Sequence, residues 1–334
     1  MEYNFDKIID RSGSGDLKHG ALLPRWGRED LLPLWVADMD FETPSFITDA
    51  LKARLEHSLF GYTVEPEDFM PSIIDWIHDH HQWDVKREWI KFIPGIVKGI
   101  GLVVNVFTNP DEKVIIQPPV YHPFRLTPEG NGREVVVNPL KMRDDGYYDM
   151  DFENLEKVCD EKCKVFILCN PHNPAGRVWK KEELERMNDI CMKHGVKVIA
   201  DEIHCELVMP GYHYTPFASI SEACRDNSVT LNSPTKAFNI AGLQIANIIC
   251  PDAALRRRID RAININEVCD VNPFGVIALQ AAYNEGEEWL DELNQYLWEN
   301  YQALKDFFTT ELPQVRVTRL EGTYLVWLDI LGIE

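Results

Sequence analysis

Residues 228–239 read Ser-Val-Thr-Leu-Asn-Ser-Pro-Thr-Lys-Ala-Phe-Asn. The first five residues predict a strand that is buried on both faces. The other seven predict a small turn, rich in hydroxyl groups, that carries Lys236. A lysine in such a turn can be partly desolvated, which lowers the pKa of its amine and makes the amine a nucleophile. Taken alone, the pattern is also typical of a lysine in a surface loop.

Apolar segments of this kind recur along the chain, and most of them end in polar or turn-forming residues. We predict strands over residues 113–117, 164–169, 196–200, 228–232, 245–250 and 324–330. We predict helices over residues 45–57 with Ser45 as N-cap, from Pro71, from Gly95, over residues 181–194 and over residues 287–312. This alternation indicates an α/β fold with a mostly parallel central sheet sandwiched by helices. Ligands of such sheets bind at the carboxyl ends of the strands.

The strand predicted over residues 196–200 ends at Asp201-Glu202-Ile203-His204. A carboxylate at the buried end of a strand is unfavourable unless a cation lies beside it. The pyridinium nitrogen of pyridoxal phosphate is such a cation, and an Asp beside it keeps the ring a strong electron sink. The alternative is that Asp201 only caps a helix.

Three weaker signals lie on other turns. Residues 170–176, Asn-Pro-His-Asn-Pro-Ala-Gly, form a rigid turn that can aim the Asn173 amide at a ligand oxygen, or simply a tight loop. Tyr121 follows Pro118-Pro119-Val120 and could stack on a flat ring, or only pack. Gly95 precedes a predicted helix whose first N–H groups could bind a phosphate.

The composition limits the class of protein. The 334 residues carry a formal net charge of −20, which disfavours nucleic acid and anionic membranes as partners. No apolar stretch approaches the ~18–20 residues of a membrane helix, and residues 1–6 do not resemble a signal peptide, so we expect a cytoplasmic protein. The eight cysteines show no metal-site spacing; we expect reduced, packed thiols and no bound metal.

Taken together and in this order, the segments resemble the fold-type I pyridoxal-phosphate enzymes, the aspartate aminotransferase superfamily. Residues 35–41, Trp-Val-Ala-Asp-Met-Asp-Phe, with residues 201–204 and 233–236, resemble its MalY/PatB cystathionine β-lyase (C–S lyase) group. The resemblance implies a large cofactor-binding domain over residues 45–286. It also implies a smaller α/β domain, built from residues 1–44 and 287–334. Since members of the group run on for some tens of residues, we expect this domain to be incomplete at the C-terminus and to lack the arginine that binds the substrate carboxylate.

The resemblance also implies roles for individual residues. Lys236 would bind pyridoxal 5′-phosphate covalently and act as the base, and Asp201 would pair with the ring nitrogen. Asn173 would bind the phenolic oxygen, and Tyr121, the second expected catalytic residue, would stack over the ring. His204 stands where many aminotransferases have a tyrosine.

The same resemblance places four residues at the phosphate. These are Ser233, the turn amides of Ile96 and Val97, and Tyr62 reaching across the interface of a homodimer. Gln244 stands near the position of a phosphate-binding arginine in many aminotransferases, so we expect less positive charge there.

The implied reaction is a β-elimination on a small amino-acid substrate, L-cystathionine or a related cysteine S-conjugate, giving a thiol, pyruvate and ammonia. A class I/II aminotransferase is the main alternative, because it shares every step up to the carbanion. A second alternative is a regulatory protein that binds the cofactor and acts on a transcription activator. A dinucleotide-binding dehydrogenase is disfavoured because no Gly-x-Gly-x-x-Gly follows any predicted strand.

Overall fold

The computed structural model describes residues 3–333; Met1, Glu2 and Glu334 lie outside this range, and with them the start of the segment searched above for a signal peptide. Its centre is a seven-stranded sheet in the order β1-β9-β8-β7-β6-β2-β3. The strands are β1 (Ile90–Ile93), β2 (Lys113–Ile116), β3 (Glu134–Val137), β6 (Cys163–Cys169), β7 (Lys197–Asp201), β8 (Ser228–Asn232) and β9 (Ala246–Ile249). Only the pairs that β9 makes with β8 and β1 are antiparallel, so the predicted mostly parallel sheet is confirmed.

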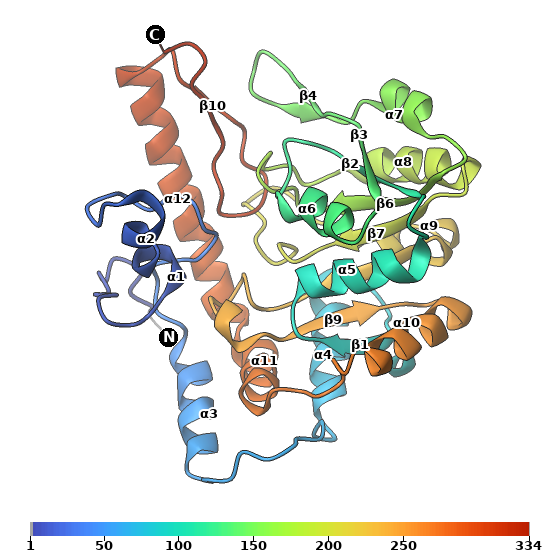
Figure 1. Ribbon diagram of the computed structural model, residues 1–334. Coiled ribbons are helices and arrows are strands. Elements are labelled where there is room, and N and C mark those ends of the chain that lie inside the picture. Colours follow the sequence, from blue (N-terminus) through green and yellow to red (C-terminus); the bar gives the residue numbers. More distant parts are fainter. Residues whose placement is uncertain (1–2, 334) are drawn as a thin grey trace.

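Helices cover both faces of this sheet, because successive strand residues point to opposite sides. In β6, Val165 and Ile167 pack into the core on one face of the sheet, while Phe166 and Leu168 pack into the core on the other. The first face carries α5 (Ile96–Phe107), α6 (Pro123–Gly130) and α10 (Ala253–Ile265); the second carries α7 (Phe152–Val158), α8 (Lys181–Lys193) and α9 (Glu222–Asp226) (Figure 1). The strands are apolar along nearly their whole length because helices bury both faces of the sheet.

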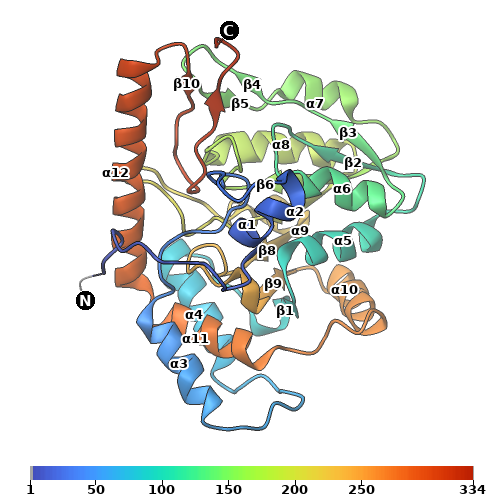
Figure 2. The same ribbon diagram turned by 60° about the vertical axis from the view of Figure 1, so that its left-hand side comes forward.

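A third core forms beside the edge of the sheet that β1 occupies. It packs α3 (Ser45–Leu55), α4 (Phe69–His81) and α11 (Pro273–Glu285) around the start of α12 (Glu287–Glu311). The N-terminal segment carries the short helices α1 (Leu17–Gly20) and α2 (Leu22–Trp26), and Figure 2 shows it crossing in front of the sheet. Short 3-10 turns occupy Arg87–Trp89, Phe217–Ser219 and Ala241–Leu243.

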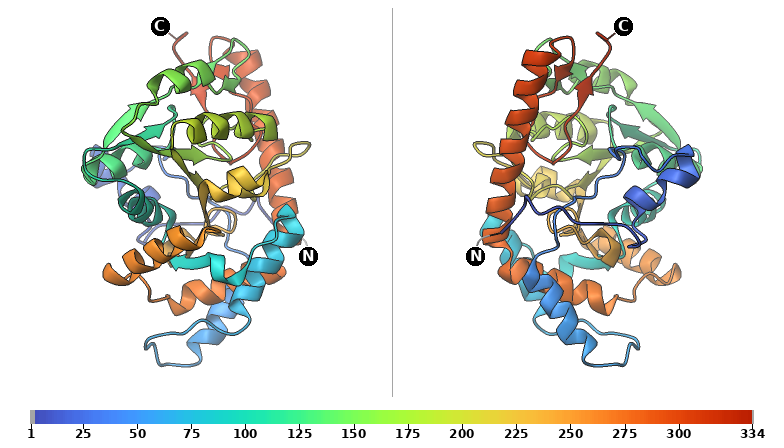
Figure 3. Two further views of the ribbon diagram at one scale, coloured as in Figure 1. Left: turned by 90° about the vertical axis from the view of Figure 1, so that its right-hand side faces the viewer. Right: turned by 90° about the vertical axis from the view of Figure 1, so that its left-hand side faces the viewer.

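The chain that follows α12 turns back alongside that helix (Figure 3). It holds β10 (Arg316–Val317), which pairs with β11 (Leu328–Asp329); a second small ladder joins β4 (Lys141–Met142) to β5 (Tyr148–Asp149). The strand predicted over residues 324–330 is wrong over most of its length. Its first residues are drawn away from the ladder, because the Thr323 N–H donates to the Leu207 carbonyl 2.7 Å away.

Two further sequence expectations are settled by the local structure. Ser45 is not an N-cap: Pro44 takes that position, and Ser45 is the first helical residue of α3, its carbonyl accepting from the Thr48 hydroxyl. Seven of the eight cysteines are free and buried, as expected of packing residues, and Cys269 is exposed. Within residues 3–333, no helix combines the length and the apolar character needed to cross a membrane.

Candidate active site

The carboxyl ends of the parallel strands meet the start of α5 at one pocket. Its lining brings together seven of the nine predicted site residues: Ile96, Val97, Tyr121, Asn173, Asp201, His204 and Lys236. These residues come from five separate segments of the chain, spread over more than a hundred positions. The fold therefore gathers side chains that follow predicted strands together with the first residues of a predicted helix.

Lys236 lies in the turn after β8 and projects into this pocket. Its amine donates a hydrogen bond to the Ala37 carbonyl 2.6 Å away, in the segment that follows α2. Burial lowers the pKa of this amine, while the nearby carboxylates of Asp38 and Asp201 act in the opposite direction. The turn is therefore not a surface loop, and it holds an amine that is easier to deprotonate than an exposed lysine.

Asp201 is the last residue of β7 and is only 4% exposed. Its carboxylate accepts one hydrogen bond, from the Ile203 N–H at 3.1 Å. Burial raises the pKa of this carboxyl to about 7, against the smaller opposing effects of that hydrogen bond and of Lys236. A carboxylate so deeply buried is stabilised when a cation lies beside it, which was the sequence argument for this position.

Tyr121 and Asn173 are joined through the backbone. The Tyr121 N–H donates to the Asn173 carbonyl at 3.1 Å, and the Asn173 N–H donates to the Cys169 sulfur at 3.3 Å. Burial, reinforced by the Asp201 charge, raises the pKa of the Tyr121 phenol, so this side chain stays neutral at physiological pH. The turn after β6 thus fixes one side of the pocket.

The start of α5 contributes backbone N–H groups to the pocket. Gly95, with φ of 130°, precedes α5, and the first helical residues Ile96 and Val97 line the pocket. The first N–H groups of a helix are unpaired within it and attract anions. Gln244 accepts a hydrogen bond from Lys98 at 2.7 Å. Lys98 directly follows Val97 and was not among the predicted site residues.

Ser233 and Tyr62 are the two predicted site residues outside the pocket lining. Ser233 is buried in the Lys236 turn, where its hydroxyl donates to the Ile245 carbonyl at 2.6 Å and meets the Thr235 hydroxyl at 2.8 Å. Tyr62 lies in the loop between α3 and α4 and is 97% exposed. Nothing within residues 3–333 brings Tyr62 to the pocket of the same chain.

His204 lies on the turn after β7 and is buried, with Nδ1 lacking a partner among the described residues. Burial lowers the pKa of its imidazole to about 3, so the ring is neutral. Tyr324 meets it edge-on, with ring centroids 5.9 Å apart. The sequence argument also missed smaller lining residues, for which an isolated position carries no signal: Ala37, Cys169, Ile203, Thr235 and Ala241.

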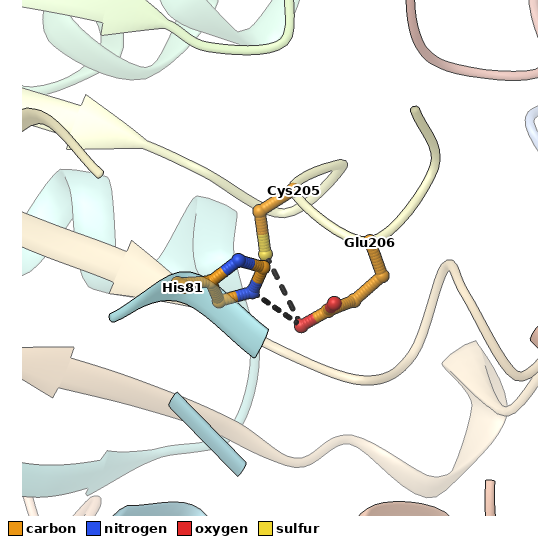
Figure 4. Close-up of side chains that lie close together, drawn as sticks. All are labelled: His81, Cys205 and Glu206. Atoms are coloured by element: carbon orange, nitrogen blue, oxygen red, sulfur yellow. Dashed lines mark hydrogen bonds and ion pairs between the residues drawn. The ribbon is translucent and has the colours of Figure 1, made fainter. Parts of the chain in front are cut away.

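A cluster of three side chains lies near His204: Cys205 and Glu206 are buried on the same turn, and the half-buried His81 ends α4 (Figure 4). Their ligand atoms lie within 4.8 Å of one another, as in a metal site. However, one Glu206 oxygen already accepts from the Trp76 indole at 2.7 Å and pairs with His81 at 3.1 Å. The Cys205 thiol donates to the same Glu206 oxygen at 3.5 Å, so the three side chains form a hydrogen-bonded cluster built on the His81–Glu206 ion pair.

This ion pair ties α4 to the turn that carries His204, and its loss is expected to destabilise the fold. Glu206→Ala should lower the free energy of unfolding by about 3–5 kcal/mol, because it leaves a buried histidine without its counter-charge. Asp84→Ala removes a similar pair with His78 on the surface and should change it by less than about 0.5 kcal/mol. Urea denaturation of both variants measures the difference; equal effects would contradict this account.

The pH dependence of the same pair has a defined sign. Glu206 raises the pKa of His81 although burial opposes this, and His81 in turn lowers the pKa of Glu206 despite its burial. The stabilisation is therefore complete between the ordinary pKa values of the two groups, about 4.5 and 6.5. It is lost as the pH rises through the raised pKa of His81. The stability difference between wild type and Glu206→Ala should shrink on that alkaline side.

Comparison with known proteins places this site in a family. The family described as aminotransferase class I and II matches residues 29–332. Cystathionine beta-lyase PatB of Bacillus subtilis (strain 168) is 45% identical over 327 residues, 98% of this chain and 84% of that protein. Protein MalY of Escherichia coli (strain K12) is 32% identical, over 98% of this chain and 84% of that protein.

A solved structure shows the same arrangement of the chain. Cystalysin from Treponema denticola, whose crystal structure contains a pyridoxal 5′-phosphate cofactor, superposes with a TM-score of 0.94 at 37% identity. The match covers 98% of this chain and 84% of cystalysin. The chain therefore belongs to the class I and II aminotransferase family, with the fold of the fold-type I pyridoxal-phosphate enzymes, and within it to the group of PatB and MalY.

Proposed function

We propose that this protein is a cytoplasmic, pyridoxal-phosphate-dependent C–S lyase. It cleaves L-cystathionine, or a related cysteine S-conjugate, to a thiol, pyruvate and ammonia. The observation that carries the proposal is the meeting of a desolvated amine, Lys236, and a buried carboxylate, Asp201, in one pocket. The identity to PatB supports the choice of a lyase within the family.

The residues of the pocket are chemically complementary to pyridoxal phosphate. Its aldehyde requires an amine, which Lys236 supplies, and its cationic ring nitrogen requires a carboxylate, which Asp201 supplies. The Asn173 amide and the neutral His204 are available to the phenolic oxygen, and the face of Tyr121 to the ring. The N-terminal turn of α5, together with the Ser233 turn, would hold the phosphate.

When bound, the cofactor supplies an electron sink for the carbanion formed at the substrate Cα. The protein supplies the proton transfer and the orientation. The Lys236 amine takes the Cα proton, for which its lowered pKa is suited because a base must be neutral to act. Asp201 keeps the ring nitrogen protonated, since a buried carboxylate strongly favours a neighbouring cation. The leaving thiolate departs from the β-carbon.

A product balance on L-cystathionine tests the proposal. Cleavage consumes one water and gives homocysteine, pyruvate and ammonia in equal amounts, with no added keto acid. The chain is loaded with pyridoxal phosphate, and free thiol and pyruvate are measured from the same sample. Equal release of both is expected. Conversion that depends on an added keto acid and yields no pyruvate would instead establish an aminotransferase, because the proton is then returned to the cofactor.

We propose further that two copies of the chain form a homodimer in which Tyr62 reaches the phosphate site of the partner. The loop that carries Tyr62 also exposes Leu59, Phe60 and Val64, from 54 to 85%. A cluster of exposed apolar side chains is typical of an interaction surface. The pocket would then be completed only in the dimer.

The dimer makes a prediction for cofactor affinity. Tyr62→Ala should raise the Kd for pyridoxal phosphate about tenfold, because one hydrogen bond to a charged group is worth about 1.5–3 kcal/mol. Ile265→Ala, which removes another exposed apolar side chain on α10, should leave the Kd unchanged. Light scattering establishes the mass, and cofactor fluorescence the Kd. A monomer, or an unchanged Kd in Tyr62→Ala, would refute the shared site.

A further inference from the structure

Residues 321–324, Glu-Gly-Thr-Tyr, lie next to the active-site pocket, because Tyr324 contacts His204 of the pocket lining. Tyr324 is half-buried beside His204, with the two rings meeting edge-on at 81°. In residues 3–333, no hydrogen bond joins the Tyr324 hydroxyl to another group. Burial raises the pKa of this phenol, as do the nearby Asp38 and Tyr121, so the hydroxyl remains a hydrogen-bond donor. Asp38 likewise acts on the charge of Lys236, so these groups share one neighbourhood.

Glu321 anchors this segment to the turn that carries Asn173. Its carboxylate pairs with the buried Arg177 guanidinium at 3.0 Å and accepts from the Val178 N–H at 3.1 Å. The N–H groups of Glu321 and Gly322 both donate to the Gly176 carbonyl, at 2.7 and 3.1 Å. A buried polar network in which the charged groups are all paired is rigid. It therefore holds the backbone of residues 321–322 against the turn that carries Asn173.

Gly322 permits the close approach that this anchoring requires. A Cβ built on it would lie 2.8 Å from the Val178 side chain and 3.0 Å from that of Pro171. It would also lie 3.1 Å from the Leu207 carbonyl. Residue 322 therefore lies between the turn after β6, which carries Asn173, and the turn after β7, which carries His204.

Thr323 is held in a conformation that its side chain opposes. It is completely buried with φ of 70°, where a β-branched residue is a genuine outlier. Its N–H donates to the Leu207 carbonyl at 2.7 Å, and its hydroxyl accepts from the Leu325 N–H at 3.1 Å. Such strain persists only where the surroundings impose it, and it concentrates at functional sites. Tyr324 follows directly, so the backbone conformation of Thr323 determines where the Tyr324 side chain lies.

We propose that Tyr324 contacts the bound substrate and helps to determine which amino acid the site accepts. The ring forms a wall of the substrate space beside His204 and Tyr121, and the hydroxyl donates to a polar group of the substrate. The inference rests on the function proposed above, because it takes the bound amino acid to lie next to Lys236. An aromatic wall suits a thioether substrate, since sulfur makes favourable contacts with aromatic rings.

Three variants of the full chain, each loaded with pyridoxal phosphate, test this role. Tyr324→Ala should raise KM for L-cystathionine about tenfold or more, with the affinity for pyridoxal phosphate within about twofold of wild type. Tyr324→Phe keeps the ring and should show a smaller rise. Tyr301→Phe is the matched control, because it removes another buried phenol, bonded to the Thr318 carbonyl, in the same part of the chain. It should lower Tm and leave KM unchanged.

The outcomes separate a substrate contact from a structural role. A KM within about twofold of wild type in Tyr324→Ala, or an equal loss of cofactor affinity, would overturn the proposal. If Tyr324→Ala does not fold, Tyr324→Phe decides: a raised KM supports the contact, and an unchanged KM overturns it.

The test remains available if the lyase proposal fails. A wild-type chain that forms no pyruvate from L-cystathionine refutes that proposal alone. Binding of L-alanine, followed by the change in cofactor absorbance, then replaces turnover as the probe. A Kd for L-alanine raised in the Tyr324 variants supports the contact, and a Kd unchanged from wild type overturns it.

Discussion

Replacement of Lys236 by alanine is expected to lower pyruvate formation from L-cystathionine by about 10³-fold or more. The substitution removes both the amine that would hold the cofactor and the base that would take the Cα proton. No other lysine lines the pocket in the described part of the chain. The measurement is the steady-state rate of pyruvate release at saturating pyridoxal phosphate.

Lys197→Ala is the control for this experiment. Lys197 begins β7 at the opposite end of the strand from Asp201, and its amine donates to the Asp226 carbonyl at the surface. Its loss should leave the rate unchanged. A Lys236→Ala protein that folds, binds the cofactor and retains most of its activity would refute the role assigned to this amine.

Asp201→Asn is expected to have opposite effects on stability and on activity. Burial raises the pKa of Asp201 from 3.8 to about 7, so the cofactor-free protein loses stability as the pH rises through this interval. Asparagine carries no charge, and should therefore stabilise the cofactor-free protein by roughly 4 kcal/mol at pH 8 and by less than half of that at pH 5. Turnover should fall about 10²–10³-fold, because the ring nitrogen loses its counter-charge.

Glu202→Gln separates these two effects. Glu202 is equally buried, and burial also raises the pKa of its carboxyl to about 7, but it binds the Phe217 N–H instead of lining the pocket. Its substitution should give a pH-dependent gain in stability with activity within a few-fold of wild type. Urea denaturation at both pH values measures the first effect and pyruvate release the second. Full activity in Asp201→Asn would contradict the proposed ion pair with the cofactor.

The sequence predicted which residues lie together in one pocket where each of them directly follows a strand. β8 is found over the predicted residues, and β7 ends at Asp201 itself. Because parallel strands place their carboxyl ends at one edge of a sheet, residues that are far apart in sequence, such as Asn173 and Lys236, could be assigned to one pocket. The resemblance to a family then supplied their expected roles.

Contacts between distant segments could not be predicted in the same way. Glu206 and His81 are 125 residues apart, and neither position has a pattern that indicates the other. Tyr324 lies 88 positions after Lys236, in an apolar stretch that predicted a strand. Its true course depends on the hydrogen bond to Leu207 and on the anchoring of Glu321 by Arg177. Tertiary contacts of this kind override local propensity.

The proposed function depends most of all on Lys236 as the residue that holds the cofactor. The most direct measurement is to load the chain with pyridoxal phosphate, reduce it with borohydride and locate the pyridoxyl group by peptide mass spectrometry. We expect one modified lysine, Lys236, in the peptide that contains residues 233–239. A pyridoxyl group on any other lysine, with Lys236 unmodified, would contradict it.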